Sequence, residues 1–175
     1  MPRAAFADPA DVQMLIFDVD GVLTDGSVFI LPEGGEAKRF SVRDGSGIRT
    51  WLDLGFQVGI ISGRDSPAVN HRMRELGVKH VMQGCSDKAA GLATMTKAAG
   101  VDARACAFLG DDVQDIPALT RVGYPMCVGD AHESLKGRCV YITRAPGGHG
   151  AAREAIEHLI AAKGLTPTVV QRYDS

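Results

Sequence analysis

The chain has 175 residues, of which 45% are hydrophobic and 23% are charged, and its formal net charge is −2. This composition is typical of a soluble globular protein, and the length fits one domain with a substantial buried core. The lack of a basic surplus argues against a nucleic-acid-binding function, and no apolar run predicts a membrane-spanning helix. We expect a single domain with its core over about residues 12–164 and a flexible tail over 165–175.

Apolar runs alternate with helical patterns along the chain. Apolar residues at helical spacing predict helices after Asp44, around Val69–Leu76, around Leu92–Ala99 and over Ala151–Ala162. This alternation predicts an α/β fold with a doubly wound, Rossmann-like parallel sheet. The expected strands are Met14–Phe17, Val58–Ile61, Val81–Met82, Ala105–Leu109, Pro125–Val128 and Val140–Ile142.

One segment, about residues 27–42, interrupts this alternation. Val28–Leu31 and Ala37–Val42 flank a turn that contains Gly34 and Gly35, a pattern typical of a β-hairpin. The hairpin is much too short to form a cap domain. It is either a surface flap or a contact between subunits that also frames an active site, because an uncovered apolar hairpin tends to pair with another chain.

The four cysteines, Cys85, Cys106, Cys127 and Cys139, are widely spaced and form no CxxC pair. Most of them stand beside apolar residues, so we expect buried thiols rather than disulfides or zinc ligands. Thiols of this kind fit a protein that resides in a reducing cytoplasm.

The most informative motif follows the first expected strand. Asp18 and Asp20 are two residues apart where Met14–Phe17 gives way to a loop. Side chains two apart on an extended backbone point the same way, so both carboxylates face the crevice where open α/β sheets bind ligands. They indicate a divalent cation, a covalent nucleophile with a proton shuttle, or both. Their spacing alone does not rank one above the other as the nucleophile.

Polar residues also follow two other expected strands. Ser62-Gly63-Arg64 comes after Val58–Ile61, and a hydroxyl beside a flexible backbone suits the binding of phosphate oxygens. Gly110-Asp111-Asp112 comes after Ala105–Leu109. Adjacent acids on an extended chain cannot both point into one pocket, so one would bind a metal. The other would orient a neighbour or cap the next helix.

Lys88 stands near the start of the third expected helix. If it points into the acidic pocket, it neutralises phosphate and carboxylate charge together; the alternative is a solvated surface lysine. A nucleophile, an acid–base group, oxyanion donors, a lysine and metal ligands are the parts of a phosphoryl-transfer site.

These parts resemble the four motifs of the haloacid dehalogenase superfamily of phosphotransferases. Longer segments, at residues 38–48, 83–88, 110–115 and 147–154, are similar to the 3-deoxy-D-manno-octulosonate 8-phosphate phosphatases within that superfamily. The resemblance extends from about residue 14 to about residue 164, and Cys85, Asp87 and His149 are its departures. The four motifs correspond to Asp18-Val19-Asp20-Gly21, Ser62, Lys88 and Gly110-Asp111-Asp112.

The resemblance implies an enzyme that forms an aspartyl-phosphate. Asp18 would be its nucleophile, and Asp20 would protonate the leaving oxygen and then deprotonate water. Mg²⁺ would be bound by the carboxylates of Asp18 and Asp111 and by the backbone carbonyl of Asp20. Ser62 and the Gly63 amide would hold the phosphate, Lys88 would neutralise charge, and Asp112 would support the site.

The resemblance also implies a substrate and an assembly. The substrate would be a small phosphorylated sugar acid used in lipopolysaccharide synthesis, and the family has no cap domain and forms homotetramers through its hairpins. Arg64 and Arg72 are the candidates for binding the sugar or its carboxylate, because a guanidinium matches a carboxylate in bidentate geometry. A solvated helix arginine is an equal alternative for Arg72.

Three rival functions remain open from the sequence. A phosphatase of a nine-carbon ulosonate 9-phosphate would use the same site. A non-catalytic phospho-signalling module would also gather acids and a lysine around Mg²⁺, although such modules lack an Asp-x-Asp motif after the first strand. A degenerate subunit would bind metal without turnover.

Overall fold

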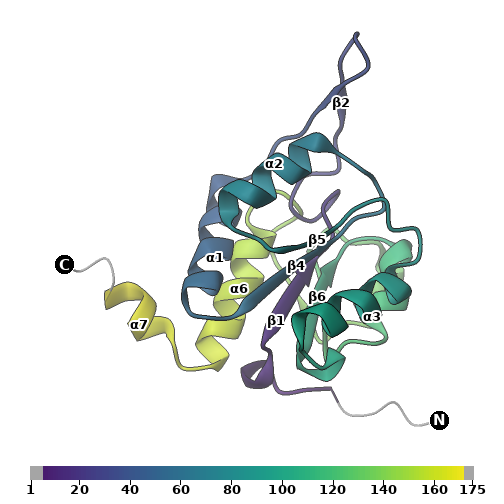
Figure 1. Ribbon diagram of the computed structural model, residues 1–175. Coiled ribbons are helices and arrows are strands. Elements are labelled where there is room, and N and C mark those ends of the chain that lie inside the picture. The colour runs from purple at the N-terminus through teal and green to yellow at the C-terminus, as the bar shows by residue number, and fades with distance from the viewer. Residues whose placement is uncertain (1–5, 172–175) are drawn as a thin grey trace.

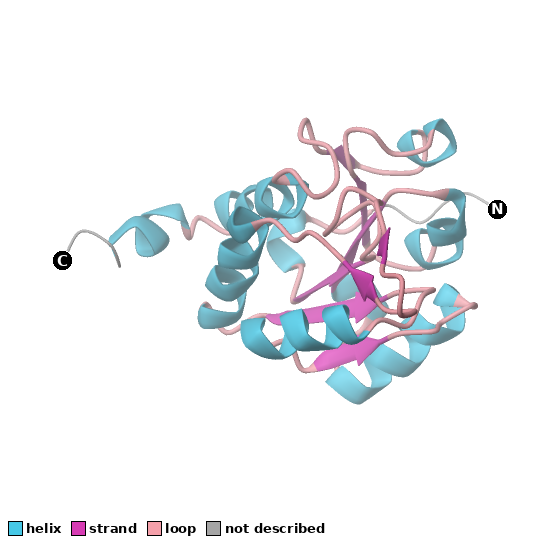
Figure 2. Cartoon of the chain, turned by 90° about the horizontal axis from the view of Figure 1, so that it is seen from above, coloured by secondary structure: helices cyan, strands magenta, loops and turns pink. Residues whose placement is uncertain are grey.

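The computed structural model describes residues 6–171 and places a parallel sheet between two layers of helices (Figures 1 and 2). The six strands lie in the order β5-β4-β1-β6-β7-β8, so the predicted doubly wound α/β fold is confirmed. Each strand predicted for this sheet is present, with ends shifted by no more than one residue. The strands are β1 (Met14–Phe17), β4 (Gln57–Ile61), β5 (His80–Met82), β6 (Cys106–Gly110), β7 (Tyr124–Cys127) and β8 (Tyr141–Ile142).

The helices cover both faces of the sheet. α1 and α6 pack together on one face, and α3 lies on the other (Figure 1). α2 and α3 end at Gly77 and Gly100 as predicted, each in the left-handed conformation. The helices are α1 (Val42–Asp53), α2 (Pro67–Leu76), α3 (Lys88–Ala99), α4 (Ile116–Leu119), α5 (Glu133–Lys136), α6 (Ala151–Ala162) and α7 (Thr166–Gln171).

β1 is the central strand on which the site depends. All four of its residues are buried, and it pairs with β4 on one side and with β6 on the other. Chain order reverses across β1, so the loops after β1, β4 and β6 converge at one edge of the sheet. Such a switch point is where open α/β sheets leave a crevice for a ligand.

The hairpin is a separate antiparallel pair, β2 (Phe29–Ile30) and β3 (Glu36–Ala37), that projects beyond the sheet (Figure 1). Its second arm is shorter than predicted, because α1 already begins at Val42. The Ser41 hydroxyl accepts a hydrogen bond from the Asp44 N–H and caps this helix, so the chain cannot continue as a strand.

The C-terminal segment differs from the flexible tail expected over 165–175. Within it the chain forms α7, and Leu165 and Val169 pack against the hydrophobic core. Residues 172–175, the rest of the expected tail, lie outside the described residues.

Two further findings concern the cysteines and the helices. None of the four cysteines forms a disulfide, as predicted; Cys106 and Cys127 are buried as expected, whereas Cys85 and Cys139 are only half-buried. Within residues 6–171, no helix has the length and apolar character needed to span a membrane.

Candidate active site

Asp18 lies at the centre of the site. Its N–H donates to Leu109 O at 3.1 Å, which extends the pairing of β1 with β6. Asp18 is only 2% exposed. The loop then turns back sharply, since the N–H groups of Val22, Leu23 and Thr24 all donate to Val19 O.

A glycine in this loop allows the metal-ligand candidates to meet. Gly21 has a φ of +87°, and a Cβ added there would lie 2.0 Å from Asp111 Oδ2. Any other residue would displace the Asp111 carboxylate from the loop that carries Asp18 and Asp20. The glycine of the Asp-x-Asp-Gly pattern therefore leaves the space that the Asp111 carboxylate occupies.

Asp115 is a buried carboxylate that sequence reasoning did not select as a site residue. It is 0% exposed, and its Oδ2 accepts hydrogen bonds from the N–H groups of Asp111 and Asp112. Its Oδ1 lies 2.6 Å from Lys88 Nζ. Asp115 thereby fixes the loop after β6 and the lysine at the same time. The spacing Asp112-x-x-Asp115, that of a capping box, was the signal that could have identified it.

Lys88 is the first residue of α3, and its side chain points into the site rather than into solvent. Its Nζ lies 2.9 Å from Asp18 Oδ2, and the residue is 3% exposed. The side chain of Asp87 caps α3 by accepting hydrogen bonds from the N–H groups of Ala89 and Ala90. This cap makes Lys88 the first residue of the helix. Burial opposes its charged form, but the charges of Asp18 and Asp115 raise the pKa of Lys88 above its ordinary value.

Three carboxylates, those of Asp18, Asp111 and Asp115, have oxygens within 4.8 Å of one another. Burial and the charge of Asp115 raise the pKa of Asp18 to about 6 and that of Asp111 to about 8. Among the described residues no donor reaches Asp111 Oδ1, although this atom is buried. A divalent cation would offset the repulsion among the three carboxylates, and it would give Asp111 Oδ1 a partner.

The oxygens that remain free indicate which acids fit a metal ion. Both Asp115 oxygens are already engaged by Lys88 and the two backbone N–H groups. Within the described part of the chain, Asp18 Oδ1 accepts one hydrogen bond, from the Val19 N–H at 2.7 Å, and keeps room for a further partner. An all-oxygen donor set suits a hard cation such as Mg²⁺. Asp18 and Asp111 therefore fit as metal ligands, and Asp115 fits as the residue that orients their surroundings.

A polar cavity of about 360 Å³ opens beside these carboxylates. Its lining comes largely from the segments after β1, β4 and β5. It includes most of the residues that the sequence predicted for the site. Cys85, Ser86 and Gln114 line it without having been predicted. The lining residues are Asp18, Asp20, Ser62, Gly63, Arg64, Cys85, Ser86, Lys88 and Gln114.

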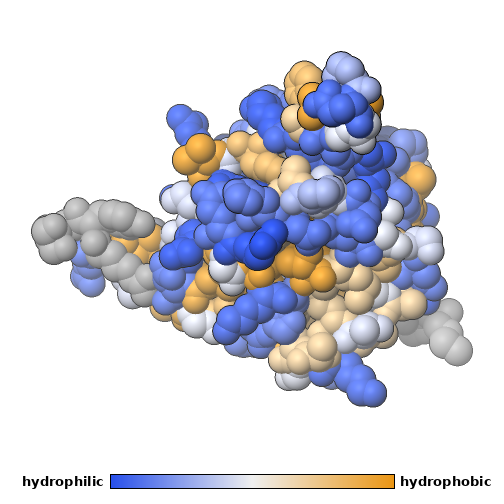
Figure 3. All heavy atoms as spheres, turned by 45° about the horizontal axis from the view of Figure 1, so that its top comes forward, coloured by the Kyte–Doolittle hydropathy of each residue, from blue (hydrophilic) through white to orange (hydrophobic). Residues whose placement is uncertain are grey.

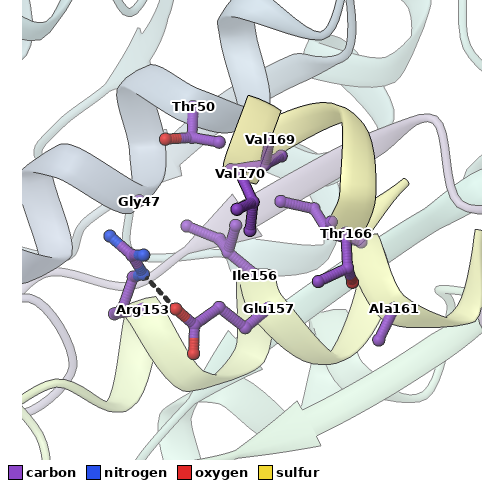
Figure 4. A pocket seen from close by; sticks show the side chains of 10 residues that line it. Gly47, Thr50, Arg153, Ile156, Glu157, Ala161, Thr166, Val169 and Val170 are labelled. Carbon is purple, nitrogen blue, oxygen red and sulfur yellow. Dashed lines mark hydrogen bonds and ion pairs between the residues drawn. The ribbon is translucent and has the colours of Figure 1, made fainter. Parts of the chain in front are cut away.

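A second cavity, of about 390 Å³, lies between α1, α6 and α7 (Figure 4). Its lining is mainly apolar, from side chains such as Ile156, Val169 and Val170. Its charged residues, Arg153 and Glu157, are paired with each other at 2.6 Å. The lining that is described for this cavity lacks a cluster of carboxylates beside a lysine, whereas the polar cavity has Asp18, Asp20 and Lys88, so the polar cavity is the candidate active site.

Comparison with known proteins identifies the family. A haloacid dehalogenase-like hydrolase family matches residues 80–154. The chain is 40% identical over 158 residues to the 3-deoxy-D-manno-octulosonate 8-phosphate phosphatase of Escherichia coli K12, an alignment that covers 90% of this chain and 84% of that protein. The chain belongs to this phosphatase family.

Solved structures of the family have the same fold. The Moraxella catarrhalis phosphatase, in complex with magnesium, phosphate and KDO, matches with a TM-score of 0.92 and 34% identity, over 95% of each chain. The cobalt-bound Haemophilus influenzae phosphatase matches with a TM-score of 0.87 and 38% identity, over 90% of this chain and 92% of that one.

Two predicted site residues of this phosphatase family member lie apart from the cavity. Asp112 caps the 3₁₀ turn Val113–Asp115, and its side chain accepts from the Val113 N–H at 2.7 Å, which is the capping alternative. Arg72 pairs with Glu75 at 2.8 Å, and its Nη2 lies 2.2 Å from where a Cβ of Gly45 would be. Arg72 therefore packs α2 against α1, and the structure does not bring it to the predicted substrate site.

Two further charged residues near the site were missed by sequence reasoning. Lys38 and Glu36 both belong to the hairpin, and the Lys38 side chain is 0% exposed. Lys38 Nζ contacts Asp20 Oδ1. Glu36 and Lys38 are two residues apart, a spacing that places both side chains on one face of an extended chain. This spacing was the sequence signal that could have identified them.

Proposed function

We propose that the chain is a Mg²⁺-dependent phosphatase that hydrolyses 3-deoxy-D-manno-octulosonate 8-phosphate to the free sugar acid and phosphate, in lipopolysaccharide synthesis. One observation carries the proposal. The buried Asp18 carboxylate lies 2.9 Å from Lys88 and shares one polar cavity with Asp20 and Ser62. Family membership supports the choice of reaction and substrate.

The first step is phosphoryl transfer to the protein. One oxygen of the Asp18 carboxylate attacks phosphorus, and the bond between phosphorus and the sugar oxygen breaks with its electron pair going to that oxygen. Asp20 gives its proton to the leaving oxygen. The Ser62 hydroxyl and the Gly63 N–H donate to the phosphoryl oxygens, and the Lys88 ammonium offsets their charge.

The second step releases phosphate. Asp20, now a carboxylate, takes a proton from water, and the water oxygen attacks phosphorus. The bond between phosphorus and Asp18 breaks, which restores the nucleophile. When bound by Asp18, Asp111 and the Asp20 carbonyl, Mg²⁺ supplies positive charge that neutralises the phosphoryl group.

Arg64 is the residue of this site that best fits the carboxylate of the substrate. It lines the cavity, and its side chain is 52% exposed, so it can reach a ligand. A guanidinium binds a carboxylate through two parallel hydrogen bonds. A nine-carbon ulosonate 9-phosphate carries the same groups and is the competing substrate.

The proposed assembly is a homotetramer formed through the hairpins. Phe29, Ile30 and Leu31 are 59%, 72% and 39% exposed, and hydrophobic residues are visible on the projecting hairpin (Figure 3). Apolar side chains on an uncovered strand pair favour association with another subunit. Light scattering at micromolar concentration should give the mass of four chains; a monomeric mass would contradict this assembly.

The proposed location of the protein is the cytoplasm.

Phosphate release by the purified protein tests the function. The two ulosonate phosphates are compared side by side, with Mg²⁺ and with EDTA. The proposal requires a higher kcat/KM for the eight-carbon substrate and loss of turnover in EDTA. Preference for the nine-carbon substrate would change the substrate assignment. Absence of release from any sugar phosphate would indicate a signalling module or a degenerate subunit instead.

A further inference from the structure

Four charged side chains form a ring at the base of the hairpin, namely Asp20, Lys38, Glu36 and Arg64. Lys38 Nζ contacts Asp20 Oδ1 and lies 3.6 Å from Glu36 Oε1. Arg64 Nη2 lies 2.7 Å from Glu36 Oε2, and Arg64 Nε lies 3.7 Å from Asp20 Oδ2. Positive and negative groups alternate around the ring, which joins the hairpin to the loops after β1 and β4.

The two cations of the ring differ in exposure. The Lys38 side chain is 0% exposed, whereas that of Arg64 is 52% exposed. A buried ammonium is held where its acidic partners are, because moving it away from them leaves an uncompensated charge. An exposed guanidinium can leave Asp20 for a ligand at little cost. Asp20 Oδ1 is therefore fixed from the protein side, and Oδ2 is the oxygen that can be vacated for chemistry.

Glu36 holds Lys38 from the other side. Its side chain is 13% exposed and lies between the two cations of the ring. Glu36 lies in β3 and Lys38 directly follows this strand; their side chains, two residues apart, meet at the loop that carries Asp20. The hairpin thus contributes to the active site through its base as well as presenting an apolar tip.

We propose that Lys38 is a positioning residue: it fixes Asp20 Oδ1 and thereby presents Oδ2 to the sugar oxygen that leaves. This inference rests on the proposed function and adds a residue to its first step. A general acid must lie within hydrogen-bond reach of the atom that it protonates, and a displacement of about 1 Å can cost about 10²-fold in rate.

Leaving-group dependence separates this role from others. In Lys38→Met, kcat/KM for the sugar-acid phosphate should fall by about 10²-fold. It should fall similarly for glucose 6-phosphate, which has no carboxylate but whose leaving sugar oxygen is equally basic and needs the same proton. The loss on p-nitrophenyl phosphate should be much smaller, because its weakly basic leaving group needs little protonation.

The controls address charge and folding. Lys38→Arg keeps the cation and should recover most of the loss on the alkyl phosphates. Lys136→Met removes a lysine that pairs with Glu133 at 3.0 Å on α5, and should change none of the rates. Inhibition by inorganic phosphate should be unchanged in Lys38→Met, since Ser62 and Lys88 remain. If thermal unfolding shows that Lys38→Met does not fold, Lys38→Gln takes its place.

Several outcomes would overturn the inference. Equal losses on all three substrates would assign Lys38 to the phosphate or to the fold, and a loss confined to the sugar-acid phosphate would assign it to the carboxylate. Unchanged rates would remove any role. Failure of the unmodified protein to act on any sugar phosphate would instead overturn the proposed function, and this inference with it.

Discussion

Lys88 Nζ lies 2.6 Å from Asp115 Oδ1, and both side chains are buried. A buried ammonium is costly unless it is paired, so this contact keeps the Lys88 side chain inside the protein, beside Asp18. Because the second oxygen of Asp115 accepts the Asp111 N–H, one carboxylate aligns the lysine and the loop of a metal-ligand candidate. Asp115 thus supports catalysis without being required to touch the substrate.

Asp115→Asn should lower the free energy of unfolding by about 3 kcal/mol, because it removes one partner of a buried ion pair. In urea unfolding the midpoint should fall while the slope stays unchanged. Asp102→Asn is the matched control, since Asp102 caps the Arg104 N–H on the surface. It should cost less than about 1 kcal/mol. Equal costs for the two variants would show that the contact with Lys88 contributes little.

Most of the candidate site could be predicted because it follows from strand ends. Asp18, Ser62 and Asp111 each come directly after an apolar run, and parallel strands bring such ends to one edge of a sheet. The pattern of apolar residues fixed each run to within a residue. Side-chain direction along a helix is less certain from sequence, and for this reason Lys88 was left between two alternatives.

The residues that were missed depend on contacts between distant segments. Lys38 comes to Asp20 only because the hairpin folds over the loop after β1. The packing of Arg72 depends on such contacts too: spacing left substrate binding and a solvated arginine as equal alternatives, and the side chain lies toward Gly45 and Glu75 rather than toward the cavity. Sequence spacing defines the face of an element, but it does not define what packs against that face.

Asp18→Asn should abolish phosphate release and leave the fold intact. An amide cannot form the acyl-phosphate, whereas its size matches that of the carboxylate it replaces. Phosphate release measures the first effect, and thermal unfolding measures the second. Substantial residual turnover by a folded Asp18→Asn protein would remove Asp18 from the role of nucleophile.

Asp111→Ala should raise the Mg²⁺ concentration needed for half-maximal activity by at least about tenfold. The reason is the loss of a carboxylate whose buried Oδ1 has no donor within the described part of the chain. Titration of activity with Mg²⁺ measures this shift. An unchanged Mg²⁺ requirement would exclude Asp111 as a ligand.

Stability without metal should depend on pH through the same carboxylates. Burial and the charge of Asp115 raise the pKa of Asp111 from 3.8 to about 8 and that of Asp18 to about 6. The folded chain then binds more protons than the unfolded chain between about pH 4 and about pH 8. In EDTA, stability should therefore fall as the pH rises through this window.

Mg²⁺ should reverse this trend, since it binds the deprotonated carboxylates. The increase in Tm on adding saturating Mg²⁺ should be larger at pH 8 than at pH 6. Thermal unfolding with and without EDTA measures the difference, and Asp111→Asn should reduce it. An Mg²⁺ effect that is the same at both pH values would contradict the raised pKa of Asp111.

The two arginines provide a test of specificity. Arg64 lines the cavity, and Arg72 packs between α2 and α1. Arg64→Ala should lower kcat/KM for the sugar-acid phosphate about tenfold more than kcat/KM for glucose 6-phosphate, the range for losing a charge-assisted hydrogen bond. Both substrates have a basic sugar oxygen as the leaving atom, which Asp20 protonates, so any effect of Arg64 on Asp20 cancels in this ratio.

Arg72→Ala is the matched variant on the neighbouring helix. It should lower the free energy of unfolding by about 1 kcal/mol, through loss of packing on α1, and leave the ratio of the two kcat/KM values unchanged. Urea unfolding and the same two assays measure both effects. A selectivity loss in Arg72→Ala as large as that in Arg64→Ala would mean that Arg72 reaches the carboxylate after all. An unchanged ratio in both variants would mean that neither arginine recognises the sugar acid.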